Sequence, residues 1–239
     1  MPPIRGKIRR PAAGVSLVEL AVVISIIALI VSVMAGAVKI QRASFIQGTL
    51  SDVTGHQTAF ENFGQQYASV PGDMDDAKEY WGSETENGDG DGDVAYASSG
   101  NCEALRAWQH LSLAGYMQSG FSGAATGGGN QADIGVNVPA ASRNKIGYYV
   151  EYASLGGEAA RNNIVVGAFR SGGKNANAAL LPRDAKAVDL KADDGLPNAG
   201  KVRGEKGQDV SDAAQCASGD EYTLATDDPA CVLAFPVLP

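Results

Sequence analysis

Nineteen consecutive uncharged residues, Leu20 to Val38, separate Glu19 from Lys39. Most of them are Val, Ile, Leu or Ala. As a helix rising about 1.5 Å per residue, this run is about 28 Å long, close to the roughly 30 Å hydrocarbon core of a bilayer. The run therefore predicts a membrane-spanning helix near the start of the sequence.

The charges on either side of this run differ in sign. Residues 1–14 hold four basic side chains, Arg5, Lys7, Arg9 and Arg10, and no acidic one. The whole chain has 19 basic and 27 acidic residues, so the remainder has 15 against 27 and a net charge of −12. Basic segments stay on the cytoplasmic side of a membrane, which predicts that the C-terminal body lies outside. An acidic body also argues against a nucleic-acid partner, because phosphate contacts need Lys and Arg.

An ordinary secretory signal peptide is the simpler alternative. The small residues Ala35-Gly36-Ala37 would then form the cleavage site. The apolar run is longer than a usual signal core, however. Glu19 would also cost a few kcal/mol on insertion, with no benefit to a peptide that is discarded. Both features favour a retained helix.

The stretch "RRPAAG", followed by "VSLVEL" and the apolar run, resembles the class III signal of type IV prepilins and type II secretion pseudopilins. The resemblance implies that a prepilin peptidase cuts between Gly14 and Val15 and N-methylates Val15. Glu19 is then the fifth mature residue, as in the family, although Val15 replaces the usual Phe or Met. It also implies that the Glu19 carboxylate meets the amino terminus of a neighbouring subunit during assembly. The alternative is a lone protonated carboxyl group with a raised pKa.

This resemblance implies a structural subunit of a type IV pilus or a type II secretion pseudopilus, and not an enzyme. Its partners would be the prepilin peptidase, other pilin or pseudopilin subunits and the inner-membrane assembly platform. The subunit would cross the bacterial inner membrane once, with a periplasmic head, before joining a filament that can be extracellular. One alternative is a low-copy tip pilin whose head binds a surface or a secreted substrate. The other is a membrane-tethered hydrolase whose leader matches by accident.

Helical periodicity continues beyond the apolar run. Apolar residues recur at intervals of three, four or seven, at Ile46, Leu50, Val53, Phe60, Phe63 and Tyr67. We expect one helix from about Leu17 to Tyr67, ended by Pro71-Gly72, with His56 facing solvent. The predicted organisation is a basic leader (1–14), a transmembrane or polymerisation helix (15–38), an amphipathic half-helix (39–69) and a pilin-like head (70–239).

The head is expected to be α+β, with the stalk helix packed on an antiparallel sheet. The pattern predicts helices at 73–81, 102–117 and from Pro182 to about Leu190. It predicts neighbouring antiparallel strands at 146–155 and 162–170, and further strands at 222–226 and 231–237. Residues 82–100, 120–135 and 193–204 are expected to be loops.

Two acidic segments are candidate Ca²⁺ sites. Asn87, Asp89, Asp91 and Asp93 follow the first half of an EF-hand loop, but Ser98 stands where its last carboxylate should be. We expect Glu103 to supply that carboxylate; the alternative is a solvated acidic loop. The second segment, with Asp189, Asp193 and Asp194, resembles the Ca²⁺ loop of major pseudopilins, or else flanks a helix end and a turn.

The chain has three cysteines, Cys102, Cys216 and Cys231. They form no CxxC motif and the two histidines are far apart in the sequence, so a zinc site has little support. If the body is exported, a disulfide is permissible, and Cys216 and Cys231 are the favoured pair. Three reduced thiols are the alternative.

Overall fold

One helix, α1 (Leu17–Tyr67), contains both the apolar run and the amphipathic stretch after it, as predicted. The computed structural model describes residues 14, 16–100 and 102–237. The chain divides into an N-terminal unit, Met1–Ala43, and a C-terminal unit, Ser44–Pro239. The residues of α1 from Ser44 onwards therefore belong to the C-terminal unit. The leader up to residue 13, and Val15, lie outside the described residues.

The C-terminal unit is α+β. Besides α1 it contains the helices α2 (Ala77–Trp81), α3 (Glu103–Leu113) and α4 (Pro182–Ala192), and the short 3₁₀ helices η1 (Gly82–Glu84) and η2 (Ala213–Gln215). Its four-stranded sheet consists of β1 (Ile146–Ala153), β2 (Arg161–Ala168), β6 (Cys231–Pro236) and β3 (Arg203–Lys206), in that order. The neighbouring strands are antiparallel. A separate two-stranded hairpin pairs β4 (Ala217–Ser218) with β5 (Glu221–Tyr222).

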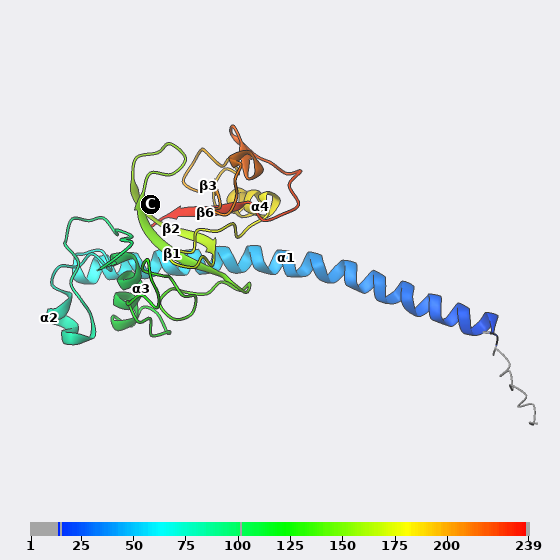
Figure 1. Ribbon diagram of the computed structural model, residues 1–239, viewed down its shortest axis with the longest axis horizontal. Coiled ribbons are helices and arrows are strands. Elements are labelled where there is room, and N and C mark those ends of the chain that lie inside the picture. Colours follow the sequence, from blue (N-terminus) through cyan, green and yellow to red (C-terminus); the bar gives the residue numbers. More distant parts are fainter. Residues whose placement is uncertain (1–13, 15, 101, 238–239) are drawn as a thin grey trace, which may run out of the picture. The chain divides into compact units, whose positions relative to one another are not determined.

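The strands β1, β2 and β6 contain β-branched and aromatic residues, which favour a half-buried pleated surface. The predicted pairing of the first two strands is confirmed, with Val150 opposite Ile164. Ile164 in turn lies opposite Phe235 of β6. These three side chains belong to the main core. Figure 1 shows β1, β2 and β6 beside the part of α1 that belongs to the C-terminal unit.

The apolar stripe of α1 forms one side of this core. Ile46, Val53, Phe60 and Phe63 are buried, and Leu50 and Tyr67 are partly buried. The Phe60 ring meets the edge of the Trp108 ring from α3, with 5.7 Å between ring centroids. The amphipathic pattern therefore identified the face of α1 that packs against the rest of the unit.

His56 is an exception, because the expectation that it faces solvent is wrong. Its ring packs edge-on against Trp108 and Tyr148, at centroid distances of 5.1 and 4.8 Å. Burial lowers the pKa of His56 to about 4. His56 stands three residues after Val53 and four before Phe60, so it shares their buried face.

Two further segments differ from expectation. The strand β3 begins at Arg203, at the end of the predicted loop 193–204. Its sequence RGEK has no apolar alternation, and it is held by pairing with β6. The predicted strand at 222–226 is wrong beyond its first residue, because β5 ends at Tyr222.

The turn after α1 is pressed against the backbone of α3. Gly72 has a φ of +95°, and a Cβ built there would lie 2.4 Å from the Glu103 carbonyl oxygen. Only glycine fits both the backbone conformation and this close approach. The turn at Pro71-Gly72 therefore not only follows the end of α1 but also packs closely against the backbone of α3.

Candidate functional site

The N-terminal unit presents an apolar helical surface. All side chains from Leu17 to Ser32 are exposed, including Leu17 at 86% and Leu29 at 67%. By length and composition α1 can cross a membrane, and none of its most apolar window is buried. The core helix of a soluble protein would be mostly buried, so this exposed run is consistent with a membrane anchor, as it would be with a signal sequence near the N-terminus.

Glu19 lies in the first turn of α1 and contributes to its N-terminal cap. The Ser16 backbone N–H donates to Glu19 Oε2 at 3.4 Å, and the Val18 N–H donates to Ser16 Oγ at 3.3 Å. With Ser16 as the N-cap, the Glu19 bond is that of a capping box, whereas Ser16 Oγ bonds to the N2 rather than the N3 backbone N–H. The sequence carries the Ser-x-x-Glu signature of a helix start at residues 16–19. Glu19 thus caps the helix of its own chain. Gly14, the other described residue of the predicted processing motif, is exposed.

The first acidic loop is organised by Asp73, a residue that the sequence reasoning did not single out. Its carboxylate accepts backbone N–H bonds from Gly90 at 2.8 Å, Asp91 at 3.2 Å and Gly92 at 2.8 Å. Carboxylate oxygens of Asp73, Asp89 and Asp91 lie within 4.8 Å of one another. A cation at this position would therefore involve Asp73.

The remaining predicted ligands of this loop have other partners. Asn87 Oδ1 accepts a hydrogen bond from the Lys78 backbone N–H at 2.9 Å. Glu103 accepts N–H bonds from Asp89 at 3.2 Å and Ala95 at 3.1 Å. Asp93 does not belong to the carboxylate cluster. Of the five residues predicted to bind Ca²⁺ in this loop, the structure therefore brings only Asp89 and Asp91 together in the carboxylate cluster.

The second acidic cluster does form as a group. Carboxylate oxygens of Asp189, Asp193 and Asp194 lie within 4.8 Å of one another at the end of α4. The Asp189 side chain is fully buried and accepts bonds from the Tyr222 hydroxyl at 2.7 Å and the Gly195 N–H at 3.2 Å. Burial raises its pKa to about 6, and the neighbouring Asp194 and Asp193 add to that increase. Hard oxygen ligands of this kind suit Ca²⁺.

A disulfide joins Cys216 to Cys231, the pair favoured from the sequence. The loop between them carries the β4–β5 hairpin and therefore Tyr222. The disulfide loop thus supplies the hydroxyl that bonds to the second acidic cluster. Cys102 is a free, buried thiol.

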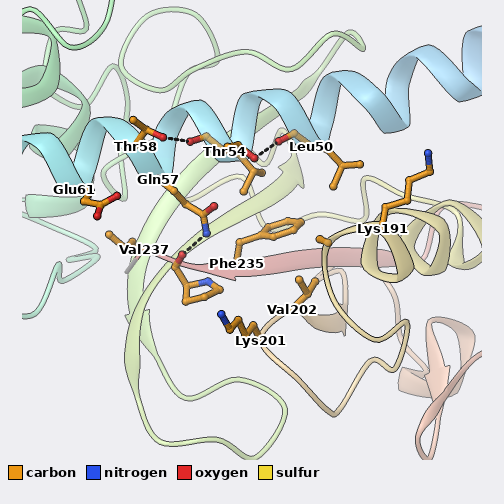
Figure 2. Close-up of a pocket in the computed structure, with 13 residues that line it drawn as sticks. Leu50, Thr54, Gln57, Thr58, Glu61, Lys191, Lys201, Val202, Phe235 and Val237 are labelled. Atoms are coloured by element: carbon orange, nitrogen blue, oxygen red, sulfur yellow. Dashed lines mark hydrogen bonds between the residues drawn. The ribbon is translucent and has the colours of Figure 1, made fainter. Parts of the chain in front are cut away.

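A groove of about 530 Å³ lies between α1, the end of α4 and β6. Figure 2 shows Thr54, Gln57 and Glu61 of α1 facing Phe235 and Lys201 across it. Gln57 Nε2 donates to the Pro236 carbonyl oxygen at 2.7 Å, which ties β6 to α1. The Lys201 and Val202 backbone N–H groups at its edge bond to Asp193, so the groove borders the second acidic cluster.

Comparison of the chain with protein-family models, with curated proteins and with solved structures found no match.

Proposed function

We propose that this chain is a pilin-like structural subunit that is anchored in a membrane and then assembled through the N-terminal part of α1. The observation that carries the proposal is the exposed apolar surface of Leu17–Ser32, with one carboxylate, Glu19, in its first turn. Exposed apolar side chains on a long helix need lipid or other apolar helices around them. A filament of such helices provides the second environment after the membrane provides the first.

The proposed life cycle follows from this arrangement. The basic leader stays cytoplasmic and the C-terminal unit is exported. A prepilin peptidase removes the leader after Gly14, so that Val15 carries the new amino terminus. The subunit then polymerises with other pilin or pseudopilin subunits on an inner-membrane platform. Its role is architectural, in a type IV pilus or a secretion pseudopilus.

In this proposal Glu19 couples insertion to assembly. A lone carboxylate within lipid costs a few kcal/mol, whereas pairing with a positive group lowers that cost. The amino terminus of a neighbouring subunit would provide the positive group. Helix capping supplies a competing explanation, because the same carboxylate accepts the Ser16 backbone N–H.

Two substitutions at position 19 separate these explanations. Glu19→Gln keeps an acceptor for the Ser16 N–H but removes the charge, whereas Glu19→Ala removes both. If charge pairing drives assembly, both variants insert in the membrane and fail to enter filaments. If capping is the whole role, Glu19→Gln assembles normally and only Glu19→Ala is impaired. Glu61→Ala, which removes an exposed carboxylate from the same helix outside the apolar run, is the matched control.

The processing step has its own test. Mass spectrometry of the mature protein is expected to find N-methylated Val15 at the amino terminus. A mature protein beginning at Val38 would instead identify an ordinary signal peptide and overturn the proposal.

We further propose that Ca²⁺ stabilises the C-terminal unit, and that the second acidic cluster is the better site. Asp189, Asp193 and Asp194 gather with one buried carboxylate among them. Asp73 of the first cluster is buried as well, but both of its partners, Asp89 and Asp91, are exposed, whereas Asp193 of the second cluster is partly buried. Chelation is expected to lower Tm in the wild type and in Asp89→Asn, but not in Asp189→Asn. An unchanged Tm of the wild type on chelation would refute this part.

A further inference from the structure

Arg106 on α3 has a buried guanidinium, and two of its three nitrogens lack hydrogen-bond partners in the described part of the chain. The residue is 2% exposed, and neither Nε nor Nη1 has a partner among the described residues. The nearest carboxylate oxygen is Glu103 Oε1, 3.9 Å from Nη2, which is beyond hydrogen-bonding distance. Burying a charged group without hydrogen bonds is strongly unfavourable. A ligand that supplied the missing acceptors would remove this penalty.

The one carboxylate placed to pair with Arg106 is used elsewhere. Glu103 stands three residues earlier on the same helix, which is a favourable ion-pair spacing. Both of its oxygens accept backbone N–H bonds, however, from Asp89 and Ala95 of the first acidic loop. Glu103 therefore holds that loop, and the guanidinium keeps unused hydrogen-bonding capacity.

Arg106 lines a cleft of about 600 Å³ between η1, α3 and the segment around Ser122. Two other polar side chains of the cleft, those of Gln109 and Asn130, are already bonded to backbone carbonyls. Gln109 Nε2 donates to the carbonyl oxygens of Glu84 and Ser122. Asn130 Nδ2 likewise donates to backbone carbonyls, at distances of 2.8 and 3.2 Å. Among the residues that line the described cleft, Arg106 is thus the positively charged group, and it has hydrogen bonds left to donate.

The chemistry of the cleft selects the ligand. A planar guanidinium matches a carboxylate through two parallel hydrogen bonds. Two further carboxylates line the cleft: Glu86, which is paired with Lys78, and Glu84, which is exposed. Because Glu84 disfavours additional negative charge, the ligand should carry a single carboxylate. We propose that this cleft binds a monocarboxylate, supplied by a small organic acid or by the C-terminus of a peptide, with its oxygens against Arg106.

Cys102 provides a reporter for this site. It is the free thiol among the described cysteines, is 4% exposed and lines the same cleft. A ligand in the cleft should therefore protect it from a maleimide reagent. The experiment uses the full chain in a mild detergent, with acetate, the free acid of triglycine and triglycine amide as probes.

Acetate, triglycine acid or both are expected to slow labelling about tenfold at a ligand concentration ten times Kd, and triglycine amide is expected to have no effect. Protection by acetate identifies small acids as sufficient; protection by triglycine acid alone identifies a peptide terminus. Protection by neither acid, or equal protection by the amide, overturns the proposal.

Variants tie the effect to Arg106. Arg106→Gln should abolish protection, whereas Arg170→Gln, an exposed arginine outside the cleft, should retain it. Ala125→Trp places a bulky ring at the exposed edge of the cleft without changing the guanidinium. It should keep the Tm of the ligand-free protein and lose the protection by the acid, so it tests the site even if Arg106→Gln does not fold. Unchanged protection in either cleft variant would refute the assignment.

Discussion

Lowering the pH from 7 to 5 is expected to destabilise the C-terminal unit through His110. This residue is fully buried on α3. The Gly72 backbone N–H donates to His110 Nδ1 at 3.0 Å, so Nδ1 is an acceptor and carries no proton. The proton is therefore on Nε2, which lies 3.0 Å from Thr85 Oγ1. The Thr85 hydroxyl in turn donates to Gln109 Oε1 at 2.8 Å.

Protonation would break this chain of hydrogen bonds. A second proton would have to occupy Nδ1, facing the Gly72 N–H. Burial lowers the pKa of His110 from 6.5 to about 4, and the nearby Arg106 charge lowers it further in the same direction. In the unfolded chain His110 would titrate near its ordinary value. The folded state therefore binds fewer protons than the unfolded state between these two values.

The size of the effect follows from the two pKa values. The contribution of His110 to the free energy of unfolding is fully present above about pH 6.5 and is lost as the pH falls towards about 4. At about 1.4 kcal/mol per pH unit, the full loss below pH 4 is on the order of 3 kcal/mol. At pH 5 the same relation gives a loss of free energy of unfolding on the order of 2 kcal/mol.

Urea unfolding followed by tryptophan fluorescence measures this directly. The chain has two tryptophans, and the Trp81 ring centroid lies 5.4 Å from that of His110. The comparison is between wild type and His110→Asn, whose amide oxygen can take the place of Nδ1 but does not titrate. Other ionisable groups, including His56 and Asp189, are present in both proteins and cancel in the difference.

Between pH 7 and pH 5 the wild type is expected to lose about 2 kcal/mol more than His110→Asn in free energy of unfolding. Equal losses in the two proteins would show that His110 takes up no proton on unfolding. The deduced hydrogen-bond directions at Gly72 and Thr85 would then be wrong.

Three further outcomes can be measured by the same unfolding experiment. Gly72→Ala should lower the free energy of unfolding by more than about 2 kcal/mol, because it adds a backbone clash to a left-handed φ. The control Gly115→Ala has a φ of +80° but open space around it, and should lower the free energy of unfolding by about 1 kcal/mol. Equal losses in the two variants would contradict the close approach of Gly72 to α3. Replacing Cys216 and Cys231 by Ser should cost about 3 kcal/mol for a loop of this length, and an unchanged stability would count against the cross-link. Tyr222→Phe should cost about 1 to 3 kcal/mol because it leaves a buried carboxylate oxygen without its donor; a neutral effect would contradict that bond.

The elements with strong periodicity could be predicted from the sequence. The apolar run and the stripe from Ile46 to Tyr67 specified α1, and the β-branched segments specified β1 and β2. These signals are local, because each depends on residues within a few turns or one strand. His56 shows that the same periodicity held more information, since its spacing from Val53 and Phe60 places it on the buried face.

The parts that could not be predicted depend on contacts between distant residues. Asp73 organises a loop that begins more than ten residues later, and nothing in its neighbourhood marks it for that role. The strand β3 has the composition of a loop and exists because β6 offers it a partner. Arg106 was also missed, because its isolation results from Glu103 bonding to a different segment.

The position of β6 has a consequence for the order in which this protein can fold. Of the four strands of the main sheet, β6 comes last in the sequence, yet it lies between β2 and β3. A chain emerging N-terminus first leaves those two strands without their shared neighbour until residues 231–236 are made. The hairpin of β1 and β2 can form early, but completing the sheet requires pairing across more than 60 residues. Until then one edge of β2 stays open, and this incomplete chain is the species most exposed to pairing with other chains.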